Sequence, residues 1–148
     1  MRIGIDIHGV LDHHPEKFIK LAKFTRKNGG FIYIITGPKK EKALKELYHI
    51  ADGYNSGYCF WDEVYSIVDY IKTNKIPHHY TDDGYLWTNK EEDWDKIKGE
   101  LARNLELDLH FDDSENYRKY FPAGVFCHVE RKVAGLSNRC LFPISCHS

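Results

Sequence analysis

Short apolar runs alternate along this chain with segments in which apolar residues return every three or four positions. The runs are typical of strands buried in a sheet, and the wider spacing is typical of helices that pack one face on such a sheet. The predicted strands cover residues 2–7, 31–35, 105–111 and 124–129, and the predicted helices cover 15–28, 44–51, 61–74 and 89–105. This alternation predicts an α/β fold of the Rossmann-like type, with helices on both faces of a mostly parallel sheet.

The less regular segments fall between these elements. Residues 52–58 are rich in Gly, Asn and Ser and predict a loop that leads into a short strand near 58–60. Asp82, Asp83 and Gly84 between two aromatic stretches predict a hairpin turn, because Asp-Gly tolerates the positive φ angles of such turns. Asn89 and Glu92 resemble a capping box at the start of the last helix.

Length and composition favour one domain, residues 1–148, with its core in about 2–129 and an unassigned tail at 130–148. The 148 residues are 42% hydrophobic and 14% aromatic, enough for one core. A net charge of −1 gives no overall field that would capture nucleic acid. No signal pattern and no run of transmembrane length is present, so we expect no membrane partner. The unevenly spaced cysteines predict no disulfide framework, which favours the cytoplasm: Cys59, Cys127, Cys140 and Cys146.

Polar residues stand where the predicted strands end. Asp6 ends the first strand, Thr36 and Gly37 end the second, and Asp112 and Asp113 end the third. Open α/β sheets bind their ligands at this carboxyl edge. Taken singly, Asp6 is typical of a turn acid and Thr36 of a helix cap, but together these residues predict a site.

The segment Asp6-Ile7-His8-Gly9-Val10-Leu11 resembles the first motif of the haloacid dehalogenase-like (HAD) superfamily, D-x-D-G-[TV]-L after a hydrophobic strand. The resemblance implies a phosphatase in which Asp6 forms an aspartyl-phosphate intermediate. It also implies that Mg²⁺ is bound by Asp6, the backbone carbonyl of His8 and the later acid pair. Asp113 is then the expected direct ligand, and Asp112 the water-mediated one.

Later segments extend the resemblance to about residue 129. Thr36, with Gly37, matches the second motif, whose hydroxyl binds the phosphoryl group. Lys90 matches the lysine of the third motif, which neutralises the phosphate, and Lys96 is the second choice. Because only one helix separates Asp6 from Thr36, the chain has no room there for a large cap domain.

His8 departs from the motif, since most family phosphatases carry aspartate at this position. Histidine also transfers protons near neutral pH, so we expect a weak acid-base catalyst. The alternative is a degenerate HAD-like protein that binds a phosphorylated ligand or metal with little turnover. A third class, an interaction module that kept only the sheet, is disfavoured by the retained acids.

An uncapped site implies a bulky phosphorylated substrate, such as a nucleic-acid end or a phosphoprotein, or a lid from another subunit in a homo-oligomer. The lysines after Thr36 are more typical of a solvated helix face than of a basic rim: Lys39, Lys40, Lys42 and Lys45. Trp87 and Trp94 likewise favour core packing over stacking on a base.

Overall fold

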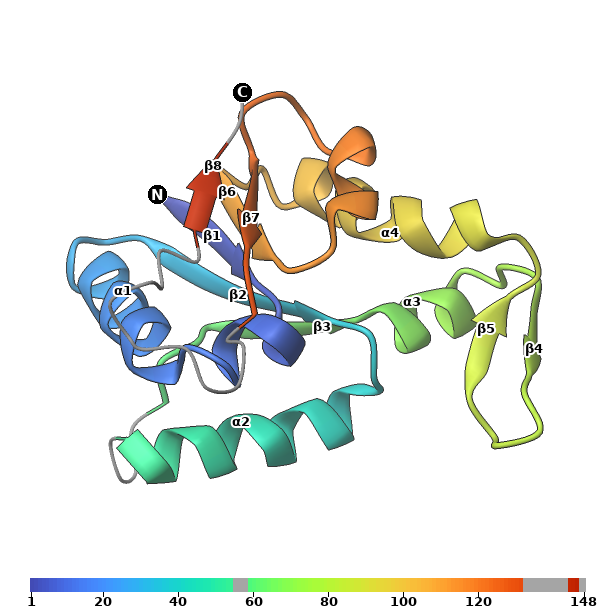
Figure 1. The fold of residues 1–148 in the computed structure, drawn as a ribbon, viewed down its shortest axis with the longest axis horizontal. Coiled ribbons are helices and arrows are strands. Elements are labelled where there is room, and N and C mark those ends of the chain that lie inside the picture. The colour runs from blue at the N-terminus through green and yellow to red at the C-terminus, as the bar shows by residue number, and fades with distance from the viewer. Residues whose placement is uncertain (55–58, 132–143, 147–148) are drawn as a thin grey trace.

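A computed structural model describes residues 1–54, 59–131 and 144–146. Its main sheet has the strand order β3-β2-β1-β6-β7-β8, in which the first five strands are parallel and β8 runs antiparallel to β7. The strands are β1 (Arg2–Ile5), β2 (Phe31–Thr36), β3 (Glu63–Ser66), β6 (Leu109–Asp112), β7 (Phe126–Val129) and β8 (Ile144–Cys146). The predicted α/β, Rossmann-like fold with a mostly parallel sheet is confirmed, and the described residues include no large cap domain (Figure 1).

Helices cover both faces of this sheet. On one face, α1 (Pro15–Lys27) and α2 (Lys40–Tyr54) pack Phe18, Ala22 and Leu47 against the isoleucines of β1 and β2. On the other, α3 (Ile67–Thr73), α4 (Glu91–Asn104) and the 3₁₀ turn η2 (Glu115–Tyr120) pack around Ile35 and Phe126. The central strand β1 is therefore shielded from water on both sides, as its continuous apolar sequence predicts.

The predicted hairpin is present and stands apart from the sheet. Strands β4 (His78–Tyr80) and β5 (Leu86–Thr88) pair antiparallel, and Gly84 in the turn has φ of +83°. Trp87 of β5 meets Trp94 of α4 edge to face, with ring centroids 4.5 Å apart. This contact ties the protruding hairpin to the start of α4 (Figure 1).

Three predicted elements differ from the structure. The helix expected over 61–74 is β3 followed by α3, because Val64 and Ser66 are buried in the alternation of a strand that pairs with β2. The strand expected near 58–60 is not formed at residues 59 and 60, and residue 58 lies outside the described residues. The strand expected from 105 begins at Leu109, since Leu105 still caps α4.

The predicted capping box is wrong. Lys90 occupies the N-cap of α4 without a side-chain hydrogen bond. The carbonyl oxygen of the Asn89 side chain instead lies 2.8 Å from Nδ1 of His79, so Asn89 joins the hairpin to the segment that precedes the helix.

Two further observations concern membrane spanning and the redox state of the cysteines. Among the described helices, none has the length and apolar character needed to cross a membrane. Cys127 is disulfide-bonded. The cysteines therefore no longer favour a reducing compartment, against our expectation from their spacing.

Candidate metal and phosphate site at the carboxyl edge of the sheet

A tight turn places the first acid of the site. Asp6 directly follows β1, and its backbone N–H donates to the carbonyl of Phe111 in β6. Its carboxylate accepts a hydrogen bond of 2.9 Å from the backbone N–H of Ile7. The turn continues through Gly9, whose φ is +82°, and Asp12 closes it by accepting from the N–H of Gly9 at 2.7 Å. The Asp6 side chain is thereby held at the end of the central strand.

Three carboxylates converge at this point. Asp6, Asp112 and Asp113 each offer an oxygen atom, and these atoms lie within 4.8 Å of one another. Asp6 and Asp112 are buried, whereas Asp113 is partly exposed. Gly9 makes the approach of Asp113 possible, because a Cβ at Gly9 would collide with the Asp113 carboxylate. The structure therefore brings the three sequence-predicted acids together, through parallel pairing of β1 with β6.

A buried lysine from α4 lies between two of these acids. Nζ of Lys98 is 2.6 Å from Oδ2 of Asp112 and 3.3 Å from Oδ2 of Asp6, and only 3% of its side chain is exposed. It also lies over the ring of Tyr117, 4.6 Å from the centroid. Burial alone would lower the pKa of Lys98, but Asp112 and Asp6 more than offset it and raise this pKa above its ordinary value. Lys98 is therefore a fixed positive charge.

The structure does not bring Lys90 or Lys96 to the acids. Lys90 is exposed at the N-cap of α4, and eight residues of helix separate it from Lys98, about 12 Å at 1.5 Å per residue. Lys96 pairs with Asp93 on the solvent side of the helix. The prediction that one of these two lysines reaches the site is wrong, and Lys98 is the residue that the sequence analysis missed.

The local packing of α4 explains why Lys98 turns inward. Its neighbours Ile97, Leu101 and Ala102 are buried, so Lys98 lies on the edge of the apolar face. Gly99 follows directly, and a Cβ there would collide with the backbone carbonyl of Tyr120 in η2. In the sequence, Gly99 in the middle of a helix could have indicated this side of α4, because such a glycine often marks a point where another segment packs closely against the helix.

Asp112 is held by several donors at once. Oδ2 receives Lys98 and lies 3.0 Å from Nε2 of His110, and Oδ1 accepts from the backbone N–H of Ser114 at 3.2 Å. Burial would raise the pKa of Asp112, but the Lys98 charge and the His110 contact hold it well below its ordinary value. His110 is itself fully buried and stacks on Phe121, and burial lowers its pKa. Asp112 is thus an ionised carboxylate whose oxygens are already occupied by protein donors.

Asp6 carries the opposite perturbation. Burial raises its pKa to about 7, and repulsion from Asp112 and Asp113 adds to this effect although Lys98 opposes it. At Asp6, burial therefore outweighs the attraction of Lys98. A bound cation would favour the ionised form of Asp6.

The acids open onto a cavity of about 400 Å³. Its lining includes Asp6, His8, Gly37, Lys98, Asp113 and Arg131. Arg131 was not predicted for the site, and its Nε lies 2.5 Å from Oδ2 of Asp113.

Thr36 precedes Gly37 at the end of β2, and it is fully buried. Its hydroxyl has no hydrogen-bond partner among the described residues. Gly37, not Thr36, lines the cavity, so the contact of this hydroxyl with a phosphoryl group stays a prediction.

His8 faces this cavity from the turn and contacts α2. Its Nε2 lies 2.8 Å from Oε2 of Glu46. The two atoms lie close together without an aligned hydrogen bond, since Glu46 Oε2 has no hydrogen-bond partner among the described residues. Nearly half of the His8 side chain is exposed, so the ring can reach a ligand in the cavity. Glu46 is a further residue that the sequence patterns did not indicate.

Comparisons with protein families, with curated proteins and with solved structures found no match for this chain. The HAD resemblance therefore stays a prediction that depends on the quoted motifs. The function has to be argued from the site itself.

Proposed function

We propose that this protein is a Mg²⁺-dependent phosphohydrolase that cleaves phosphate monoesters through an aspartyl-phosphate intermediate on Asp6. One observation carries the proposal: Asp6, Asp112, Asp113 and the buried Lys98 converge at the carboxyl edge of a parallel sheet. Phosphoryl transfer needs an oxygen nucleophile and surrounding positive charge, and this edge supplies both.

The residues fit a magnesium ion. Mg²⁺ prefers carboxylate oxygens and retains several waters, and three carboxylates within 4.8 Å match this preference. Asp6 and Asp113 line the cavity and would bind the ion directly, together with the backbone carbonyl of His8. Asp112 would act through a water, because Lys98, His110 and Ser114 already occupy its oxygens. Bound Mg²⁺ would neutralise charge on the phosphoryl oxygens and keep Asp6 ionised.

The proposed reaction has two steps. A carboxylate oxygen of Asp6 attacks phosphorus, the bond from phosphorus to the ester oxygen breaks, and the leaving oxygen takes a proton. Water then attacks the aspartyl phosphate, which releases inorganic phosphate, regenerates Asp6 and leaves a proton behind. Lys98 stabilises the negative oxygens of the phosphoryl group in both steps, and the family resemblance assigns the same role to the hydroxyl of Thr36.

His8 supplies and recovers the proton. Its ring lines the same cavity as Asp6, and Nε2 lies beside the Glu46 carboxylate, which holds the ring in place. In the first step His8 donates to the leaving oxygen, and in the second it accepts from water.

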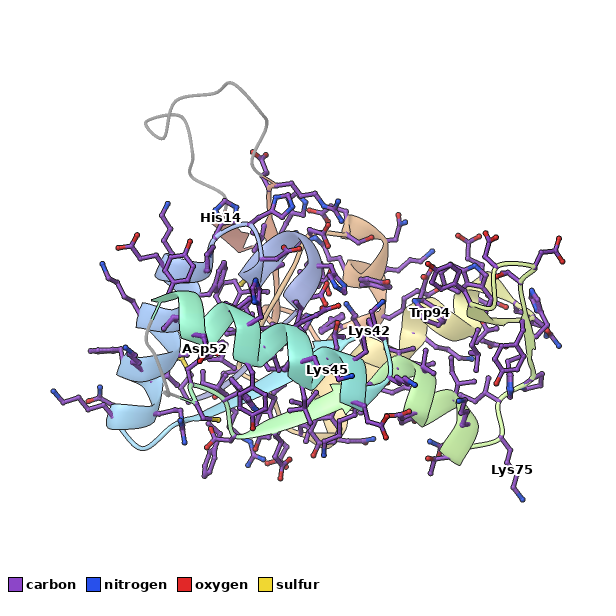
Figure 2. All side chains as sticks on the ribbon, turned by 90° about the horizontal axis from the view of Figure 1, so that it is seen from below. His14, Lys42, Lys45, Asp52, Lys75 and Trp94 are labelled. Atoms are coloured by element: carbon purple, nitrogen blue, oxygen red, sulfur yellow. The ribbon has the colours of Figure 1, made fainter. Side chains whose placement is uncertain are left out.

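The decisive experiment measures hydrolysis of p-nitrophenyl phosphate with and without Mg²⁺. Asp6→Asn keeps the shape of the side chain but loses its nucleophile, so activity should fall to background. Asp52→Asn is the matched control, since Asp52 is exposed at the end of α2 remote from the site (Figure 2). Residual turnover by a folded Asp6→Asn protein would exclude the covalent mechanism.

The alternative, a binding protein with little turnover, predicts a different result. Mg²⁺ would bind in calorimetry and Asp113→Asn would weaken it, yet no ester would be hydrolysed by the natural protein. Activity created only by His8→Asp would then identify His8 as the residue that prevents turnover. Hydrolysis by the natural protein would reject this alternative.

A further inference from the structure

A second cavity lies beside the acids, between the β4-β5 hairpin, α3 and the first turns of α2 and α4. Its volume is about 770 Å³, in the range of sites for small molecules. Gly37 and Pro38 line both this cavity and the acidic one, so the two are contiguous. A phosphate ester with its phosphoryl group at Asp6 would extend its leaving group into this space.

The larger cavity carries unbalanced positive charge. Lys39 reaches it from the segment before α2, Lys42 from the first turn of α2 and Lys72 from α3, and Asp83 is the single acid in its lining. In the described part of the chain, these three lysines form no ion pair. Uncompensated lysines that line one cavity favour an anionic ligand.

The same cavity is rich in aromatic side chains that water reaches. Tyr80, Tyr85 and Trp87 on the hairpin are 59%, 66% and 47% exposed, and such a group of exposed apolar side chains on one cavity is typical of a binding site. Trp94 lines the cavity from α4 and holds Trp87 edge to face. The expectation that Trp87 is a core residue is therefore wrong, and its ring is available to a flat ligand.

We propose that this cavity, defined by the lysines of α2 and α3 and the aromatic rings of the hairpin, binds the leaving group of a nucleotide substrate. The aromatic base stacks on the hairpin rings, and a second phosphate of the nucleotide contacts the lysines. The substrate class is a nucleoside that carries two separate phosphates, of which one is cleaved at Asp6. This inference names a substrate for the proposed phosphohydrolase and in that respect rests on it.

Other phosphate esters match the cavity less well. A sugar phosphate offers no flat ring to the exposed aromatic side chains, and a simple aryl phosphate offers no second anion to the three lysines. A polynucleotide would extend over the surface, where a net charge of −1 supplies no general attraction. A mononucleotide with two phosphates satisfies both halves of the cavity.

Binding is tested first, without turnover, by calorimetric titration of the metal-free protein with adenosine 3′,5′-bisphosphate. Lys42→Gln should raise the Kd about tenfold, because it removes a charge-assisted contact. Lys45→Gln is the matched control: Lys45 lies three residues further along α2, outside the cavity lining, and should leave Kd unchanged (Figure 2). Equal Kd values for the two variants would overturn the assignment.

Stacking is tested with Trp87→Ala and Tyr85→Ala, each expected to raise the Kd about tenfold. Tyr85 is the more exposed residue, so Tyr85→Ala gives the answer where Trp87→Ala disturbs the hairpin. Unchanged affinity in a folded Tyr85→Ala protein, or equal affinity for ribose 5-phosphate and for adenosine 3′,5′-bisphosphate, would remove the base from the proposal.

The substrate inference and the proposed function fail in different ways. Mg²⁺-dependent hydrolysis of p-nitrophenyl phosphate, with no binding of adenosine 3′,5′-bisphosphate, would reject the nucleotide and keep the phosphohydrolase. Binding that depends on Lys42, without hydrolysis of any ester, would support the nucleotide cavity and reject the phosphohydrolase. Preferred hydrolysis of the bisphosphate over ribose 5-phosphate would support both.

Discussion

Replacing Lys98 by methionine is the sharpest test of the charge balance at the acids. Methionine keeps much of the length of the side chain but removes the ammonium group that lies 2.6 Å from Asp112 and 3.3 Å from Asp6. Both carboxylates are buried, so water cannot replace the lost partner at low cost. We expect the variant to fold with a clearly reduced free energy of unfolding.

The size of the loss follows from burial. Breaking a buried ion pair by removing one partner costs about 3–5 kcal/mol, because the other charge stays buried and uncompensated. Asp6 can relieve part of the cost by taking up a proton, since its pKa is already raised to about 7, chiefly by burial. The destabilisation should therefore be larger at pH 8 than at pH 5.

Urea unfolding of the natural protein and of Lys98→Met, followed by circular dichroism at both pH values, measures this loss. Lys96→Met is the control on the same helix, because Lys96 is exposed and its pairing with Asp93 is screened by water. A loss below about 1 kcal/mol at pH 8, or a loss equal to that of Lys96→Met, would refute the buried ion pairs.

Three further changes test separate parts of the site. Gly9→Ala should weaken Mg²⁺ binding at least tenfold in calorimetry, because the new Cβ collides with Asp113. Gly29→Ala is the control, since Gly29 has a similar φ of +81° but its added Cβ would meet no other atom, so Mg²⁺ binding should be unchanged. Glu46→Gln should lower kcat for alkyl phosphates more than for p-nitrophenyl phosphate, since Glu46 contacts His8, the proposed proton donor. Equal effects on both esters would contradict this role. In the metal-free protein, burial keeps the pKa of Asp6 at about 7, against an ordinary value of 3.8. Between these two values the folded state holds a proton that the unfolded chain has lost. The free energy of unfolding should therefore fall as the pH rises from about 4 to 7. Asp6→Asn should remove this fall in urea titrations, and an unchanged pH dependence would contradict the raised pKa.

Local patterns were sufficient for most of the fold. Pro15 and the helical spacing after it begin α1, and Asp83-Gly84 forms the predicted hairpin turn. These features depend on residues close in sequence, which the patterns contain. β3 was missed because its four residues are too few to set a period, and Val64 also fits the helical spacing of α3.

The acids could be placed from sequence because each is attached to the end of a strand. Once β1 and β6 pair in parallel, Asp6 and Asp112 must meet at the same edge. Lys98 could not be placed in this way. Its position depends on how α4 is rotated and how closely Gly99 approaches η2, and both are set by packing between distant segments. In the sequence, Lys98 therefore looks like the solvent-exposed Lys96.

The two basic residues at the acids differ in a way that matters for the proposed chemistry. Lys98 is 3% exposed and pairs with two buried carboxylates, so its charge is fixed where the phosphoryl group would bind. Arg131 is 59% exposed, and its pairing with Asp113 faces water, where such contacts contribute little. A cation entering the cavity thus competes with a weakly held arginine for Asp113 while Lys98 stays with Asp112. Asp113 can therefore exchange its arginine for a cation while the charge of Lys98 stays in place, as the proposed metal-assisted phosphoryl transfer at Asp6 would need.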